Sequence, residues 1–188
     1  MGASNCLDDT RGLSRRAFFT GGAAALTVLA AKPASASILT ARPRFLSLEN
    51  LHTGEKIKAE YWAGREYLSD GLARIATVLR DHRSNAVHAI DTTLLDTLCN
   101  LRERLGIHTG FQVISGYRSP ASNAALHAAS EGVAVRSLHM EGKAIDIRVP
   151  GVSLAHVRDA ARSLGAGGVG YYAKSDFVHV DVGRVRYW

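Results

Sequence analysis

The sequence predicts an α+β fold in which helices pack on a small, mostly antiparallel sheet. Apolar residues recur at helical spacing in several segments of the middle of the chain, and they alternate with polar residues near its two ends. The strands nearest the C-terminus follow a run of helices instead of alternating with them one by one. This order favours an α+β fold over a parallel α/β sheet.

The first predicted element is a β-hairpin. Apolar and polar residues alternate across 44–62, and the His-Thr-Gly-Glu sequence at 52–55 has the composition of a turn. A helix is expected next, because apolar residues between 72 and 79 recur at helical spacing. Either Ser69 or Asp70 is expected to cap its N-terminus.

A second helix is predicted from Asp91, as the N-cap, through Leu105, with Gly106 at its C-terminal end. Residues 111–114 read as a short buried strand that ends at a glycine-containing turn. A third helix is expected to begin at Pro120 and to run to about Ser130, since proline suits the first turn of a helix.

The last third of the chain is predicted to form three strands and one helix. Ser153 is expected to begin the helix and Gly165 to end it. The strands are expected around 144–148, 167–172 and 177–183, where β-branched and aromatic residues gather.

The strand around 144–148 contains an ionisable residue between two isoleucines. Successive side chains of a strand point to opposite faces, so Ile145 and Ile147 face the core and Asp146 faces away from it. The strand "FVHVD" (177–181) repeats this pattern, with His179 on the face opposite its valines. If the two strands are neighbours, Asp146 and His179 converge.

His139 lies seven residues before Asp146, and Gly142 gives the intervening loop the freedom to fold the imidazole over the same face. Two histidines and one carboxylate predict a three-ligand Zn²⁺ site with a fourth position left open, although Fe²⁺ uses the same ligand types. The alternative interpretation pairs Asp146 with Arg148 or Arg136 and leaves the histidines without a shared partner.

The motifs of this region resemble those of a family of zinc peptidases. That group includes the D-Ala-D-Ala carboxypeptidases and dipeptidases, the lysostaphin-like endopeptidases and the Hedgehog-like fold. More narrowly, the chain from about Phe45 to Trp188 is similar to the exported murein endopeptidases of the MepK type. The motifs that carry the resemblance are "LHTGE", "ISGYRSPASN", "SLHMEGKAIDI", "AGGVGYY" and "DFVHVD".

The resemblance implies a role for each of five residues. His139, Asp146 and His179 would hold one zinc ion per chain. Asp176, three residues before the last ligand, would act as general base, although family members often have glutamate there. Arg118 of the "SGYRSP" motif would stabilise the developing negative charge.

The function that this resemblance implies is hydrolysis of the peptide cross-links of peptidoglycan by metal-activated water. The stem peptides and cross-links of peptidoglycan are therefore the expected substrate. Two alternatives stay open at this point. One is a D-alanyl carboxypeptidase of the same fold, and the other is a non-catalytic domain that binds the cell wall.

The first 36 residues are predicted to be a twin-arginine signal peptide, and residues 37–188 a single zinc peptidase domain. Arg15 and Arg16 follow a serine and precede an apolar run of about a dozen residues, which is too short to span a bilayer. Small residues at Ala34 and Ala36 suit cleavage before Ser37. We therefore expect the twin-arginine export machinery as a partner, a periplasmic location and no stable membrane span after cleavage.

Charge and cysteine content exclude other classes. The predicted leader holds four of the 23 basic residues and two of the 17 acidic ones, which leaves a charge of +4 on the rest. No basic block is interleaved with aromatic residues, so no nucleic-acid partner is expected. Cys99 would be the one cysteine left after cleavage, which excludes a disulfide framework and predicts a buried thiol.

Overall fold

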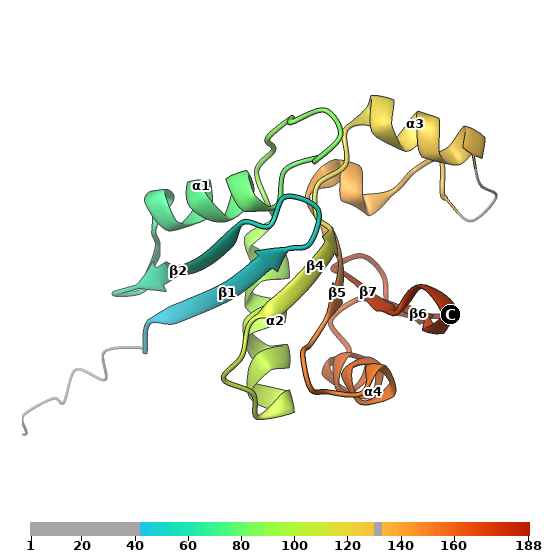
Figure 1. Cartoon of the computed structure of the whole chain (residues 1–188). Coiled ribbons are helices and arrows are strands. Elements are labelled where there is room, and N and C mark those ends of the chain that lie inside the picture. Colours follow the sequence, from blue (N-terminus) through green and yellow to red (C-terminus); the bar gives the residue numbers. More distant parts are fainter. Residues whose placement is uncertain (1–41, 130–132) are drawn as a thin grey trace, which may run out of the picture. The chain divides into compact units, whose positions relative to one another are not determined.

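The structure is a computed structural model that describes residues 42–129 and 133–188. The predicted leader, residues 1–36, lies outside these residues and stays a prediction. The described residues form one sheet of eight strands in the order β3-β2-β1-β4-β5-β7-β6-β8 (Figure 1). The strands are β1 (Arg44–Asn50), β2 (Lys56–Ala63), β3 (Glu66–Tyr67), β4 (Phe111–Ser115), β5 (Ala144–Arg148), β6 (Gly168–Tyr172), β7 (Phe177–Asp181) and β8 (Arg186–Tyr187).

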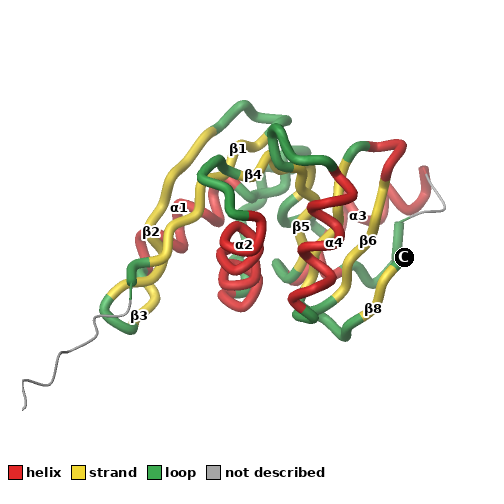
Figure 2. Tube along the Cα trace, turned by 90° about the horizontal axis from the view of Figure 1, so that it is seen from below, coloured by secondary structure: helices red, strands yellow, loops and turns green. Residues whose placement is uncertain are grey.

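Four α-helices and two 3₁₀-helices accompany the sheet in the described part of the chain, so the predicted α+β class is confirmed. They are α1 (Ser69–Val78), α2 (Thr92–Leu105), α3 (Pro120–Ala129), α4 (Leu154–Leu164), η1 (Leu138–Glu141) and η2 (Ala173–Ser175). Helices α2 and α4 lie beside each other on one face of the sheet, as Figure 2 shows. None of the helices in these two ranges is long and apolar enough to cross a membrane.

The sheet is mixed and larger than the small one predicted. Strands β1 and β2 form the predicted hairpin, with Leu48 opposite Ile57. Strand β1 also pairs in parallel with β4, where Leu48 lies opposite Phe111, and this pairing joins the hairpin to the strands that follow. Apart from this pair and the parallel pair β6–β8, the strand pairs described are antiparallel.

The ends of α2 follow local sequence signals, whereas the N-terminus of α1 does not. Helix α2 is capped by Asp91, whose carboxylate accepts from the Thr93 N–H, and it ends at Gly106 in the left-handed conformation. Helix α1 begins one residue earlier than its expected caps allow. Its N-cap is Leu68, which offers no side-chain acceptor, so the prediction of Ser69 or Asp70 as cap was wrong.

The sheet and helices α1, α2 and α4 together form the hydrophobic core. Ile145 and Ile147 are fully buried in it, as predicted, and Cys99 is buried as well. Burial of each large aliphatic side chain stabilises the fold by about 1.5–3 kcal/mol. The core therefore fixes β5 and leaves the opposite face of this strand for polar side chains. The largest fully buried side chains are Tyr61, Phe111, Leu46, Ile75, Leu79, Leu94, Leu95, Leu98, Leu101, Ile145, Ile147 and Val113.

Candidate metal centre and its cavity

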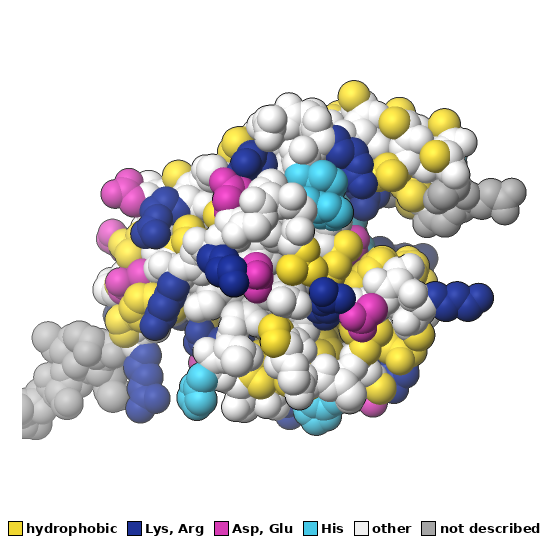
Figure 3. All heavy atoms as spheres, in the orientation of Figure 1, with side chains coloured by type: hydrophobic (Ala, Val, Ile, Leu, Met, Phe, Trp, Pro, Cys, Tyr) yellow, Lys and Arg dark blue, Asp and Glu magenta, His cyan; other side chains and the backbone are white. Residues whose placement is uncertain are grey.

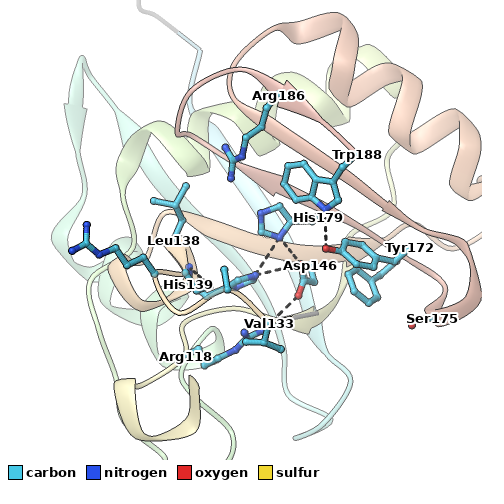
Figure 4. Close-up of a pocket in the computed structure, with 14 residues that line it drawn as sticks. Arg118, Val133, Leu138, His139, Asp146, Tyr172, Ser175, His179, Arg186 and Trp188 are labelled. Carbon is cyan, nitrogen blue, oxygen red and sulfur yellow. Dashed lines mark hydrogen bonds and ion pairs between the residues drawn. The ribbon is translucent and has the colours of Figure 1, made fainter. Parts of the chain in front are cut away.

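Strands β5 and β7 bring the first two predicted ligands together. They pair antiparallel with Asp146 directly opposite His179, so both side chains project from the same face. His179 Nδ1 lies 2.8 Å from Asp146 Oδ1. The prediction that these two strands are neighbours is confirmed, and Figure 4 shows the two side chains facing each other.

A single 3₁₀ turn carries His139 to the same place. Helix η1 begins after Ser137, whose hydroxyl accepts from the His139 N–H, and it ends at Gly142 with φ of 65°. The left-handed conformation is one that glycine adopts at little cost, and it turns the chain back into β5. His139 Nε2 thereby lies 3.3 Å from His179 Nδ1 and 3.4 Å from Asp146 Oδ1.

Hydrogen bonds on the far side of each imidazole decide which nitrogen faces the cluster. His139 Nδ1 lies 2.7 Å from the Gly116 carbonyl oxygen, which can only accept, so this nitrogen carries the proton. His179 Nε2 likewise donates to Asp181 Oδ2 at 3.0 Å. The nitrogens that face Asp146 are therefore the ones that can bind a metal, once the proton on His179 Nδ1 has left.

The donor set fits a single metal ion. Ligands that sit about 2.0–2.1 Å from a tetrahedral zinc lie about 3.3 Å from one another. The separations among the three donor atoms, 2.8, 3.3 and 3.4 Å, are close to this value. Two nitrogens and one carboxylate oxygen suit Zn²⁺, and Fe²⁺ uses the same types. His139, Asp146 and His179 can thus hold a metal ion.

Charges balance one another in this buried group. Burial opposes the charged form of His179, but its hydrogen bonds to Asp146 and Asp181 outweigh it and raise the pKa of the imidazole to about 9. Burial also opposes ionisation of Asp146, yet His139 and His179 outweigh it and hold the pKa of the carboxyl below its usual value. The cluster therefore attracts positive charge, which a metal ion supplies on displacing a proton.

Asp181 supports His179 from behind, a contact that was not predicted from the sequence. It is fully buried, and its carboxylate accepts from the N–H groups of Gly168 and Gly183 and from the guanidinium of Arg186. Its remaining contact is His179 Nε2, so it fixes the orientation and tautomer of that imidazole. The available signal was its spacing of two residues from His179, which places both on one face of β7.

The cluster lies in the wall of a cavity of about 320 Å³. Aromatic side chains form one side of it, and Trp188 is held there by a hydrogen bond from its indole N–H to the Tyr172 hydroxyl (Figure 4). No pattern in the sequence predicted this aromatic side. The full lining is Arg118, Val133, Ala134, Arg136, Ser137, Leu138, His139, Asp146, Tyr172, Ser175, Phe177, His179, Arg186 and Trp188.

Arg118 lies in the cavity, near the cluster. Its backbone N–H donates to the His139 carbonyl oxygen at 3.1 Å, which ties the turn after β4 to η1. The guanidinium Nη2 lies 4.0 Å from Asp146 Oδ2, and its Nε is buried with no hydrogen-bond partner among the described residues. The terminal nitrogens donate to Asn123 Oδ1 and Ser115 Oγ, and a guanidinium held in this way beside a metal site places positive charge near a substrate oxygen.

Asp176 is the predicted site residue that the structure does not bring into the cluster. It is absent from the cavity lining, its side chain is 62% exposed, and its carboxylate forms a 2.7 Å ion pair with Arg148 Nη1. Its backbone adopts the left-handed conformation, with φ of 55°, at the turn into β7. Its neighbour Ser175 does line the cavity, so Asp176 lies one residue from the wall.

A His-Asp-His cluster that can hold a metal ion, with an arginine beside it in an α+β fold, fits a metallopeptidase. Residues 38–188 match the family model described as peptidoglycan L,D-endopeptidase MepK, and the chain belongs to this family. The resemblance on which the expected roles depend is thereby confirmed.

Individual relatives agree with the family match. The peptidoglycan L,D-endopeptidase MepK of Escherichia coli K12 is 46% identical over 174 residues, which cover 93% of this chain and 96% of that protein. The protein of the same name from Shigella flexneri has the same identity and coverage. The probable peptidoglycan L,D-endopeptidase MepK of Haemophilus influenzae is 42% identical over 81% of this chain and 83% of that protein.

Proposed function

We propose that this chain is a zinc-dependent peptidoglycan endopeptidase that hydrolyses an L,D-peptide bond in the cross-links between stem peptides. The observation that carries the proposal is the cluster of His139, Asp146 and His179, each of which turns one potential ligand atom toward the same point. The relatives named as L,D-endopeptidases supply the substrate and the type of bond.

The chemistry divides between the ion and the residues around it. When bound, zinc lowers the pKa of water from 15.7 to about 7 and polarises a carbonyl group. The three ligands hold the ion, and Asp181 keeps His179 in the ligating tautomer. Arg118 donates from its guanidinium to the carbonyl oxygen of the scissile bond, where negative charge develops in the transition state.

We propose Asp176 as the general base that accepts the proton of the attacking water and passes it to the leaving amine. Its place next to the cavity wall supports the role, and its ion pair with Arg148 opposes it. For this role, the Asp176 side chain must leave its ion pair with Arg148 and turn into the cavity when substrate binds. Asp181 is unsuited to the role because its carboxylate is buried and already bonded to four partners.

We further propose that residues 1–36 direct the chain to the periplasm by the twin-arginine route and that residues 37–188 remain as a single peptidase domain. The support is the paired arginines, the short apolar run and the small residues before Ser37. Peptidoglycan lies outside the inner membrane, so a cross-link hydrolase has its substrate there.

The test is digestion of purified muropeptide dimers joined by an L,D bond and, in parallel, dimers joined by a D,D bond. We expect the L,D dimer to be cleaved to monomers, cleavage to stop with a chelator, and activity to return with added zinc. His179→Ala serves as the inactive control. Release of terminal D-alanine from monomers, with no dimer cleaved, would instead establish a carboxypeptidase, and binding to murein without any cleavage would establish a wall-binding domain.

A further inference from the structure

The cavity concentrates basic side chains beyond what metal binding needs. Three arginines line it, Arg118, Arg136 and Arg186, and Asp146 is the one acidic side chain in its lining. On the face of the molecule in Figure 3, by contrast, Lys and Arg side chains are spread out and interspersed with Asp and Glu. A metal ion adds two more positive charges, so the occupied cavity carries a surplus of positive charge and favours an anionic ligand.

Two of the three guanidinium groups already face a carboxylate. Arg186 forms a 2.7 Å ion pair with buried Asp181, and Arg118 lies 4.0 Å from Asp146. Within residues 42–129 and 133–188, Arg136 has no carboxylate at ion-pair distance, although it is exposed at the cavity. The Arg136 guanidinium can therefore be reached by a ligand that enters the cavity.

The backbone that carries Arg136 is held in place on both sides. Buried Asn123 donates from its amide nitrogen to the carbonyl oxygens of Ala134 and Val135, at 3.1 and 3.3 Å. On the other side, Ser137 caps the turn that holds His139. The Arg136 backbone is thus fixed three residues from a metal ligand, while its long side chain stays exposed to incoming substrate.

We propose that Arg136 is a specificity-determining residue that binds a free carboxylate of the stem peptide next to the scissile L,D bond. The planar guanidinium offers paired N–H donors that match the two oxygens of a carboxylate. Its position at the cavity, with Arg118 and the metal ligands deeper inside, suits an interaction with a group that flanks the bond and does not react. This inference rests on the proposed function, because it specifies the substrate of the same cavity.

The experiment compares two synthetic peptides that contain the same L,D bond and differ only beside it, where one has a free carboxylate and the other its amide. We expect the wild-type protein to cleave the acid with a kcat/KM about tenfold or more above that of the amide. Arg136→Gln should remove this preference by raising KM for the acid while kcat changes little. Arg136→Lys should keep part of it, since lysine retains the charge without the paired donors.

Arg104→Gln is the matched control, because Arg104 is also exposed but lies on α2, outside the cavity. It should keep the full preference, and all variants should bind zinc and melt like the wild type. The inference is overturned if the wild type cleaves acid and amide equally, or if Arg136→Gln keeps the preference. If the wild type cleaves neither peptide nor L,D muropeptide dimers, the proposed function is overturned and this inference with it.

Discussion

Asp146 is an ionisable residue in a mostly apolar, buried strand. Its two neighbours are fully buried isoleucines, and its own side chain is almost inaccessible to solvent. A buried carboxylate costs several kcal/mol unless positive charge and hydrogen bonds compensate for it. His139, His179 and Arg118 supply this compensation in the metal-free protein. A bound cation supplies more, which explains why a carboxylate occupies the position.

Asp181 should control metal affinity without touching the metal. We predict that Asp181→Asn weakens zinc binding by about 10–100-fold, because His179 loses the acceptor that fixes its ring and increases its basicity. Zinc titration against a competing chelator measures the effect.

Arg186→Gln is the control for Asp181→Asn. Both changes break the ion pair between Arg186 and Asp181, but this one leaves the hydrogen bond between Asp181 and His179 intact. It should therefore bind zinc nearly as well as the wild type. Equal losses of affinity in the two variants would show that the ion pair, and not the contact with His179, sets the affinity.

A substitution at Asp176 can distinguish the residues that bind the metal from the proposed general base. We predict that Asp176→Asn keeps its zinc and its fold and loses on the order of 10²-fold or more in muropeptide cleavage, because an amide cannot accept the proton of water. Zinc content and cleavage are measured on the same preparation. Cleavage at the wild-type rate would exclude Asp176 as the base, and loss of the metal would show that it is a ligand.

At the scale of elements, η1 depends on Gly142. Its φ of 65° is one that other residues adopt at a cost of about 1–2 kcal/mol. A Cβ added here would also overlap the carbonyl oxygen of Ala89, so the turn that carries His139 would have to move. We predict that Gly142→Ala lowers the free energy of unfolding by more than the conformational cost alone and weakens zinc binding, measured by urea unfolding and zinc titration.

Gly151→Ala is the matched control for this prediction. Gly151 has a similar φ of 78°, but an added Cβ would have no neighbour within 4 Å. The Gly151→Ala variant should lower the free energy of unfolding only by the conformational cost, about 1–2 kcal/mol, and should bind zinc normally. If the two variants were equally destabilised and both bound zinc normally, the close approach to Ala89 would have no role in placing His139.

The elements that the sequence predicted well are those that local chemistry determines. Asp91 and Gly106 bound α2 as expected, because a cap acts within a few residues of itself. The parallel pairing of β1 with β4 was not predicted, since it joins strands that lie far apart in the chain and no local pattern encodes it. Asp176 was expected beside the metal ligands, but its side chain pairs with Arg148 instead. The left-handed backbone of the turn at Asp176 sets this direction, and no sequence pattern indicated it.

At the scale of the whole molecule, the site assembles only after distant segments have met. His139 and His179 are 40 residues apart in sequence, and the turn that carries Arg118 is bonded to the His139 carbonyl. Alternation along β5 and β7 predicted which face Asp146 and His179 occupy, whereas the cavity wall also comes from loops and from Trp188, whose positions depend on tertiary packing. The three residues of the cluster could therefore be predicted from the sequence, and the surrounding cavity wall could not.

This dependence on the complete fold makes the route of export important. The twin-arginine route carries folded proteins, so a site built from such distant parts can form, and take up its metal, before the chain crosses the inner membrane. We predict that Arg15→Lys combined with Arg16→Lys abolishes the periplasmic protein and leaves precursor in the cytoplasm, as measured by fractionation and immunoblotting. Arg11→Lys, which changes an arginine of the leader outside the pair, should be exported normally. A wild-type protein that reaches the periplasm in undiminished amount in cells without the twin-arginine translocase would rule this route out. The chain would then have to fold and acquire its metal after it crosses the membrane.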